Sequence, residues 1–210
     1  MQDKKSAGFV KTVENIWYHY KFIIIVAVCV LVAFSFAEYQ SFMKKDPDVF
    51  VYHISTSGLT AMSKDEFRDS MSLIAEDYNE DGNITVDLKE DVWVPSLESV
   101  MAGGDLSSTD SFNLELAMGE CIIYIMDKNF YETNKQYMAD IEKSIGFLPE
   151  FAYDDKAILL TDLPASWRLP GFDAFSEDSY ICLREKRVGM DKVSYENHVK
   201  FFKKLIEYRP

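Results

Sequence analysis

The chain has two hydrophobic patterns: one unbroken apolar run near its start, then a long region in which apolar and polar stretches alternate. The run is FIIIVAVCVLVAFSFA, from Phe22 to Ala37, and it holds no charged residue. Trp17 and Tyr39 flank it, and aromatic side chains settle at the headgroup level of a bilayer. A helix between these two aromatics would be about 34 Å long, which suits a membrane. We therefore predict a transmembrane helix over residues 22–39.

Two other interpretations of the apolar run stay open. It is a little long for the core of a cleaved signal peptide, for which Ser35 and Ala37 would supply the small-residue cleavage site. It is also apolar on all its faces, and a soluble protein would have to be much larger to bury such a helix. Because a polar segment of about 21 residues with few positive charges precedes the run, the pattern favours a retained signal-anchor.

Basic residues near the apolar run indicate its orientation. More lysines precede the run than follow it in the next polar stretch, and basic residues next to a span stay on the cytoplasmic side. We expect a short cytoplasmic segment over residues 1–21, contact with the lipid bilayer through residues 22–39, and a cell-membrane location. Residues 40–48 are polar and are predicted to be a linker to an extracellular domain over residues 49–210.

Within residues 49–210, strand and helix patterns follow one another. Short apolar or alternating runs predict strands, and apolar residues three or four positions apart predict helices. The expected strands cover residues 49–55, 83–94, 121–127, 156–163 and 178–186, and the expected helices cover residues 63–78, 96–102, 111–118, 128–145 and 194–210. This order favours an α/β sandwich with a mostly parallel or mixed sheet. Ser63 and Ser194 are the expected N-caps of the first and last helices.

The charge of the chain excludes one class of function. Its formal net charge is -13, and no basic patch or stripe interrupts the acidic sequence. Proteins that bind nucleic acid carry such a patch. We therefore expect no nucleic-acid partner.

One polar segment, DYNEDGNITVDL, begins in the way that a calcium loop begins. Asp77, Asn79 and Asp81 occupy the first, third and fifth positions, and Gly82 occupies the sixth. The twelfth position is Leu88, which cannot supply the bidentate carboxylate of an EF-hand. The pattern favours a polar turn without metal, with a weak calcium site at Asp77, Asn79 and Asp81 as the alternative. No other cofactor is expected.

Cys121 and Cys182 both fall in expected strands. They would be able to form a disulfide if those strands are neighbours and the domain is exported. We favour two buried thiols, because a domain of this size can be stable without a covalent link. The cysteine and histidine spacing does not match a zinc site.

The sequence gives little support for catalysis. The histidines are His19 beside the apolar run, His53 in the first strand and His198 in the last helix. No Gly-x-Ser-x-Gly turn and no phosphate-binding glycine loop accompanies them. We therefore expect a protein that is not an enzyme, with His53 as a core or edge residue.

The segment from Phe147 to Phe175 is rich in aromatic residues and proline. Its ordinary interpretation is an irregular cover over the sheet, with Phe151, Trp167 and Phe172 among its packed anchors. The alternative is a recognition surface, because aromatic loops also form binding edges.

Two stretches carry a resemblance to a known family. NLELAMGECIIYIMDKNFYE, from Asn113, and KVSYENHVKFFKKLIEY, from Lys192, resemble parts of bacterial extracellular solute-binding proteins of the ABC-transporter type. The resemblance implies one degenerate lobe of that two-lobed fold. The arrangement of a basic leader, one span and a small acidic domain is also similar to uncharacterised membrane-anchored proteins of Gram-positive anaerobes.

These observations lead to one expected function and two alternatives. We expect a non-catalytic single-pass membrane protein whose extracytoplasmic α/β domain binds or scaffolds a protein partner at the membrane. The first alternative is a membrane-tethered solute-binding component of a transporter, which would have a small-molecule ligand. The second is an extracellular enzyme.

Overall fold

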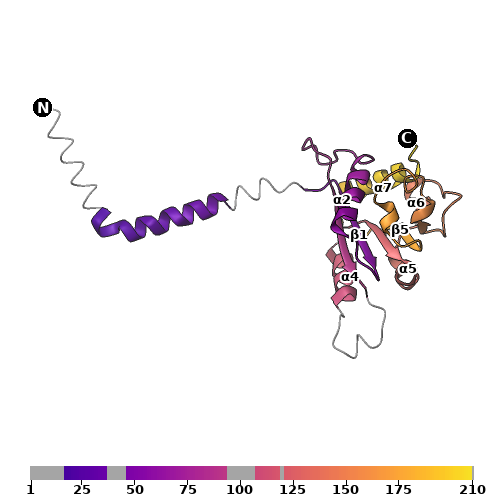
Figure 1. The fold of residues 1–210 in the computed structure, drawn as a ribbon, viewed down its shortest axis with the longest axis horizontal. Coiled ribbons are helices and arrows are strands. Elements are labelled where there is room, and N and C mark those ends of the chain that lie inside the picture. Colours follow the sequence, from indigo (N-terminus) through magenta and orange to yellow (C-terminus); the bar gives the residue numbers. More distant parts are fainter. Residues whose placement is uncertain (1–16, 37–45, 94–106, 119–120, 210) are drawn as a thin grey trace, which may run out of the picture. The chain divides into compact units, whose positions relative to one another are not determined.

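The computed structural model describes residues 17–36, 46–93, 107–118 and 121–209 (Figure 1). The chain divides into two compact units, Met1–Lys45 and Asp46–Pro210. The expected helix over residues 96–102 lies outside the described residues.

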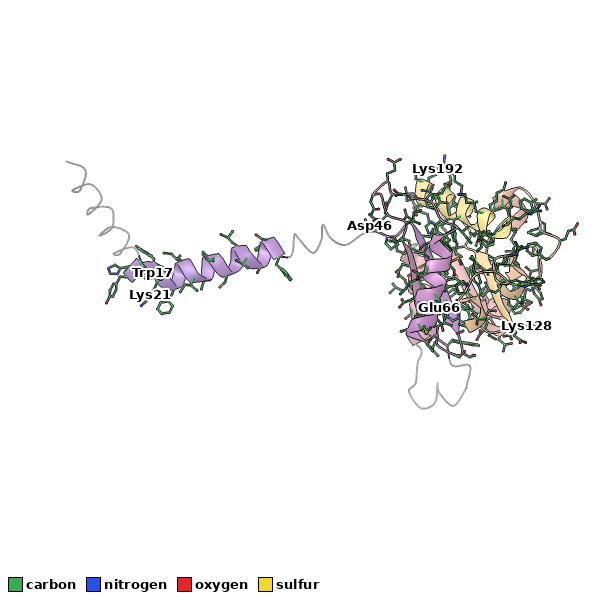
Figure 2. The ribbon with its side chains drawn as sticks, turned by 45° about the horizontal axis from the view of Figure 1, so that its top comes forward. Trp17, Lys21, Asp46, Glu66, Lys128 and Lys192 are labelled. Carbon is green, nitrogen blue, oxygen red and sulfur yellow. The ribbon has the colours of Figure 1, made fainter. Side chains whose placement is uncertain are left out.

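In the first unit the structure describes the helix Trp17–Phe36, of 20 residues with a mean hydropathy of 2.2. It is long and apolar enough to cross a membrane, and its apolar side chains project outward along its length, with Trp17 and Lys21 near its amino-terminal end (Figure 2). The described helix begins before residue 22 and ends at Phe36, one residue before the end of the apolar run.

The second unit is an α/β domain built on a mixed sheet of five strands in the order β2-β1-β3-β5-β4. The bounds of the strands are β1 (Val49–Ser55), β2 (Val86–Val92), β3 (Ile123–Asp127), β4 (Ala157–Leu159) and β5 (Ser179–Leu183). Strand β1 pairs in parallel with β2 and β3, whereas β5 pairs antiparallel with β3 and β4. The α/β class and the mixed sheet are therefore confirmed.

Helices cover both faces of this sheet because the side chains of each strand alternate between the faces. The bounds of the helices are α2 (Ala61–Ser72), α4 (Ser107–Met118), α5 (Lys128–Asn134), α6 (Ile141–Ile145) and α7 (Lys192–Ile206) (Figure 1). One buried cluster joins the first face to α2, α6 and α7, through Val49, Val51, Phe67, Met71, Ile141, Phe201 and Phe202. The other joins the second face to α4 and α5, through Tyr52, Ile54, Phe112, Phe130 and Tyr131.

The order of the strands places a topological switch point beside β1. The chain leaves β1, forms α2 on one face and returns as β2 on one side of β1; it then forms α4 on the other face and returns as β3 on the opposite side. The carboxyl ends of β1, β2 and β3 meet at one edge of the sheet because these three strands are parallel.

The structure corrects both expected helix caps. Thr60 is the N-cap of α2, and its hydroxyl oxygen accepts a hydrogen bond from the N–H of Ser63 at 3.2 Å. Asp191 is the N-cap of α7 and accepts from the N–H of Ser194 at 2.7 Å. In both helices the expected cap is the residue three positions later, whose N–H donates to the actual cap. Helix α2 also ends at Ser72, before the residues that were expected to continue it.

The long helix expected over residues 128–145 is wrong. It is divided into α5, a 3₁₀ turn η1 (Lys135–Tyr137) and α6. Between η1 and α6, Met138 forms a β-bridge with Arg184, and the N–H of Ala139 donates to the carbonyl of Leu183 at 2.8 Å. Pairing with the end of β5 replaces the helical hydrogen bonds there, so the helix is interrupted.

Candidate functional site

Polar side chains gather on one face of the sheet at the carboxyl ends of β1 and β3. His53 and Ser55 lie on the face of β1 that also carries Val49 and Val51. Asp127 ends β3 and is paired in register with Ser179, the first residue of β5. All four residues are buried. We call His53, Ser55, Asp127 and Ser179 the polar layer, which lies where the parallel strands β1 and β3 end.

His53 belongs to a hydrogen-bonded group with Glu90 of β2, its register partner. The His53 Nδ1 lies 3.1 Å from Glu90 Oε1, and the same oxygen accepts the N–H of Leu59 at 2.7 Å. Glu90 Oε2 pairs with Lys64 Nζ of α2 at 2.5 Å. The ring of Phe175 meets the imidazole edge-on, with the centroids 4.9 Å apart.

The charges of this group follow from its burial. Burial lowers the pKa of His53, and the hydrogen bond to Glu90 opposes that shift without reversing it. Burial would raise the pKa of Glu90, but its hydrogen bonds from Lys64, Leu59 and His53 outweigh burial and lower it. The group therefore consists of a neutral imidazole at pH 7 and one carboxylate balanced by one ammonium.

Asp127 is held differently. Its Oδ2 accepts hydrogen bonds from the N–H and the hydroxyl of Thr56, at 2.6 Å and 3.0 Å. Its Oδ1 is buried and has no hydrogen-bond partner among the described residues, and the same is true of the Ser179 hydroxyl oxygen. Two buried oxygen atoms, on residues paired in register across adjacent strands, thus lack the partners that buried polar groups normally have.

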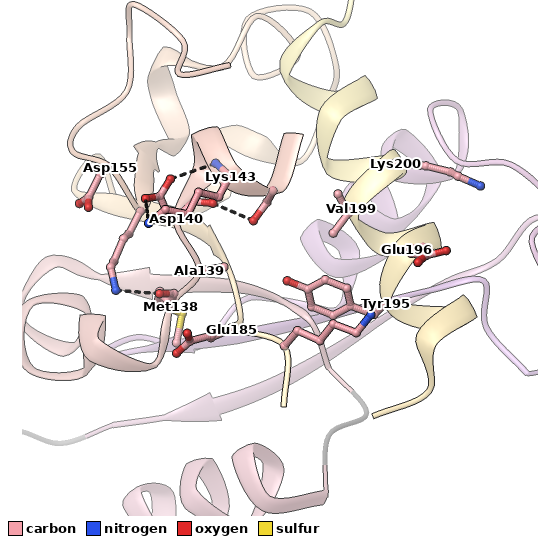
Figure 3. Close-up of a pocket in the computed structure, with 13 residues that line it drawn as sticks. Met138, Ala139, Asp140, Lys143, Asp155, Glu185, Tyr195, Glu196, Val199 and Lys200 are labelled. Atoms are coloured by element: carbon pink, nitrogen blue, oxygen red, sulfur yellow. Dashed lines mark hydrogen bonds and ion pairs between the residues drawn. The ribbon is translucent and has the colours of Figure 1, made fainter. Parts of the chain in front are cut away.

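A groove of about 710 Å³ lies elsewhere on the domain, beside α6 and α7 (Figure 3). Its lining carries acidic and basic side chains in equal number around Tyr195 and Val199. Lys143 pairs with Asp140 at 2.8 Å, and the ammonium of Lys186 lies over the Tyr195 ring, 5.2 Å from its centroid. Because its acidic and basic side chains are equal in number, the groove favours neither an anionic nor a cationic ligand, and it indicates no particular ligand.

The predicted calcium loop is organised by hydrogen bonds to its own backbone. The Asp77 carboxylate accepts the N–H groups of Asp81 and Gly82, at 3.1 Å and 2.8 Å. Asn79 Oδ1 accepts the same Asp81 N–H at 3.0 Å, and Asp81 Oδ1 accepts that of Asn83 at 2.8 Å. Among the described residues, no group of three His, Cys, Asp or Glu side chains is arranged to hold a metal ion. The weak calcium site stays a prediction.

The residue that anchors this loop to the domain was missed by the sequence analysis. Asp48, directly before β1, is buried and accepts the N–H groups of Tyr78, Asn79 and Thr85 at 2.7, 3.1 and 2.9 Å. A carboxylate that accepts three backbone N–H groups is a structural clamp. Its position before an apolar strand was the only available signal.

The two cysteines of the domain are buried free thiols, in agreement with the favoured interpretation. Cys182 lies in β5 and its Sγ is 3.6 Å from the carbonyl oxygen of Tyr124. Cys121 lies two residues before β3 rather than inside a strand. Burial raises the pKa of both thiols, which leaves them unreactive at neutral pH.

The other two histidines lie in different parts of the chain. His19 belongs to the N-terminal apolar helix. His198 is buried in α7, where its Nε2 accepts the N–H of Phe50 at 2.9 Å and its Nδ1 lies 2.8 Å from the carbonyl of Ser194. His198 thereby joins α7 to β1.

The aromatic residues of the segment 147–175 differ in how far they are buried. Phe172 and Phe175 are buried against Phe67 of α2, with centroids 5.1 Å and 4.8 Å from its ring, so they are packed anchors. Phe151 is half-buried. Trp167 is 79% exposed, and its indole N–H donates to the carbonyl of Thr161. The expectation that Trp167 is packed is therefore wrong.

Comparison with protein-family models, with curated proteins and with solved structures finds no match to this chain. The resemblance to solute-binding proteins stays a prediction.

Proposed function

We propose that this chain is a single-pass membrane protein whose α/β domain lies outside the cell and binds a protein partner without catalysing a reaction. The apolar helix Trp17–Phe36 supports the tether, because its length and composition suit a membrane span. The observation that carries the binding role is the exposure of Trp167 on a segment that is firmly attached to the domain.

The backbone on the carboxyl side of Trp167 is fixed against α2. The Ser70 hydroxyl donates to the carbonyl of Pro170 at 2.8 Å. Gly171 approaches so closely that a Cβ atom there would lie 2.7 Å from the Phe67 Cα. On the amino-terminal side, the Ser166 hydroxyl donates to the Leu163 carbonyl at 2.7 Å. The backbone around Trp167 is thus already ordered, so binding would cost little conformational entropy there, and this favours affinity.

The neighbours of Trp167 suggest what kind of surface the partner presents. Arg168 is also exposed, and tryptophan and arginine are the residue types that dominate binding energy at protein interfaces. Pro164, three residues before Trp167, lines a groove of about 530 Å³. The other residues of this groove include Phe147, Leu148, Pro149, Phe151 and Tyr208. The partner would therefore offer an apolar pocket for the indole with a carboxylate nearby for Arg168.

Site-specific photocrosslinking in native membranes tests this proposal. The full chain carries p-benzoylphenylalanine at position 167, and a matched control carries it at Val188, which is fully exposed on another segment. We expect one discrete protein adduct from position 167 that is absent from position 188. Once that protein is purified, Trp167→Ala should weaken its binding by roughly tenfold or more. Equal adduct patterns from the two positions would contradict the proposed surface.

Protease treatment of intact cells tests the tether separately. Extracellular protease should remove the domain while the helix Trp17–Phe36 stays in the membrane fraction. A domain that stays intact until the cells are lysed would contradict the proposed orientation, and a freely secreted domain would contradict the tether.

A further inference from the structure

The topology marks one edge of the sheet as a place for a ligand. In open α/β sheets, ligands bind outside the carboxyl ends of the strands, at the point where successive crossovers lead to opposite sides. Here that point lies between β1 and β3, which end at Ser55 and Asp127. The polar layer described above occupies this position, and it is separate from the surface around Trp167.

Two unpartnered oxygen atoms give an independent reason to expect a ligand there. Asp127 Oδ1 and Ser179 Oγ belong to register partners on adjacent strands, and neither has a hydrogen-bond partner among the described residues. Both residues are more than nine-tenths buried. A buried acceptor without a donor costs about 1–3 kcal/mol, and more when it is charged. Asp127 Oδ1 can only accept, whereas the Ser179 hydroxyl can accept or donate, so a donor at this place would satisfy both.

The charge of the site indicates that this donor is a cation. The Asp127 carboxylate is bonded only by Thr56, and no ion pair to it is present in the described part of the chain. The nearby ammonium of Lys64 is already paired with Glu90 at 2.5 Å. Burial keeps His53 neutral at pH 7. One negative charge in the polar layer is thus left without a counter-charge.

The oxygen set favours a nitrogen cation over a metal ion. Calcium takes six to eight oxygen ligands, whereas this site offers one free carboxylate oxygen and one serine hydroxyl. A protonated amine needs only acceptors for its N–H groups, and both free atoms can accept.

We propose that Asp127 and Ser179 form a binding site for a protonated amine, which is either the ammonium ion or the –NH₃⁺ group of an organic solute. Its N–H groups donate to Asp127 Oδ1 and to the Ser179 hydroxyl oxygen, which completes the hydrogen bonding of the polar layer. A site of this kind adds small-molecule binding to the protein, whether or not the domain also binds a protein partner.

Thermal unfolding of the full chain in nanodiscs tests the site with simple salts. Ammonium, methylammonium, tetramethylammonium and sodium chlorides are compared at equal ionic strength. We expect a saturable rise in Tm with ammonium or methylammonium and none with tetramethylammonium, which has the charge but no N–H donor. A response to ammonium alone assigns the site to the free ion, and an equal or larger response to methylammonium assigns it to an organic amine. Identical curves for all four salts would overturn the proposal.

Variants locate the response. Asp127→Asn removes the charge and places its own N–H donor in the layer, so it should weaken the ammonium response by about tenfold or more. Ser179→Ala removes one acceptor and should weaken it roughly threefold to tenfold, which keeps the test valid if the first variant does not fold. The matched control is Glu177→Gln, an exposed carboxylate of the same segment, which should respond as the wild type does. A wild-type response in Asp127→Asn or in Ser179→Ala would show that the cation binds elsewhere.

Discussion

His198 joins the last helix to the first strand through a hydrogen bond that only the neutral imidazole can make. Its Nε2 accepts the N–H of Phe50 at 2.9 Å, and its Nδ1 donates to the carbonyl of Ser194 at 2.8 Å. Protonation would place a second N–H against the N–H of Phe50. Burial already disfavours the charged ring and lowers the pKa of His198.

The lowered pKa of His198 makes the stability of the domain depend on pH in a definite direction. Below the ordinary histidine pKa of about 6.5, the unfolded chain takes up a proton that the folded chain does not. The contribution of His198 is therefore fully present above about pH 6.5 and is lost as the pH falls toward the lowered native pKa. Across that window the loss is at most about 1.4 kcal/mol per pH unit.

The perturbation is His198→Gln, because the glutamine carbonyl can still accept the Phe50 N–H and does not titrate. The free energy of unfolding of both proteins is measured by urea denaturation between pH 7.5 and 5. The wild type should lose stability more steeply than the variant, by up to about 1.4 kcal/mol per pH unit, and comparison of the two removes the contribution of His53. Parallel pH profiles would refute the reasoning, as would an NMR titration in which native His198 takes up a proton near pH 6.5.

Three further predictions concern the packing of the domain. In a urea titration, Gly171→Ala should lower the free energy of unfolding by about 3 kcal/mol, because its φ is 84° and a Cβ would overlap the α2 backbone. The control is Gly82→Ala, which has a φ of 81° but open space around it and should lower the free energy of unfolding by only about 1 kcal/mol. Asp48→Ala should cost about 3 kcal/mol by urea denaturation, because three backbone N–H groups lose their acceptor, and an unchanged midpoint would contradict the clamp. Cys121 and Cys182 should react with a thiol reagent only after unfolding, whereas labelling of either in the native protein would contradict their burial.

The class of the fold was predictable because alternation along the strands survives in the structure. VFVYHIS was predicted to be a strand, and in the structure its Val49 and Val51 point into one buried cluster and its Tyr52 and Ile54 into the other. The order of strands and helices followed from the same patterns. Membrane insertion, orientation and the family resemblance stay predictions.

Features that depend on distant partners were not predictable. The break at Met138 arises because that residue pairs with Arg184, 46 positions later, and helical spacing around it contains no sign of the pairing. The two incorrect caps have a local cause, since Thr60 and Asp191 are good caps that stand three residues before equally good serines.

The candidate site was harder still to foresee. Asp127 was recognised only as the end of a strand. The proposed site also needs Ser179 of β5, and the order of the strands, which pairs the two residues, cannot be read from the sequence. Composition also could not show which aromatic residue of the segment 147–175 is exposed, because exposure depends on tertiary contacts. Phe172 and Phe175 pack against the ring of Phe67, whereas Trp167 packs against no ring among the described residues.

The contact between α7 and β1 has a consequence for how the domain is made. Strand β1 is synthesised before the other elements of the domain. Phe201 and Phe202, which complete the core on one face of the sheet, belong to α7, the last helix of the domain. A nascent chain halted before residue 192 would therefore have α2 and α6 on this face but would lack the cover that α7 provides. The core on this face is therefore complete only after α7 has been synthesised and has packed against β1.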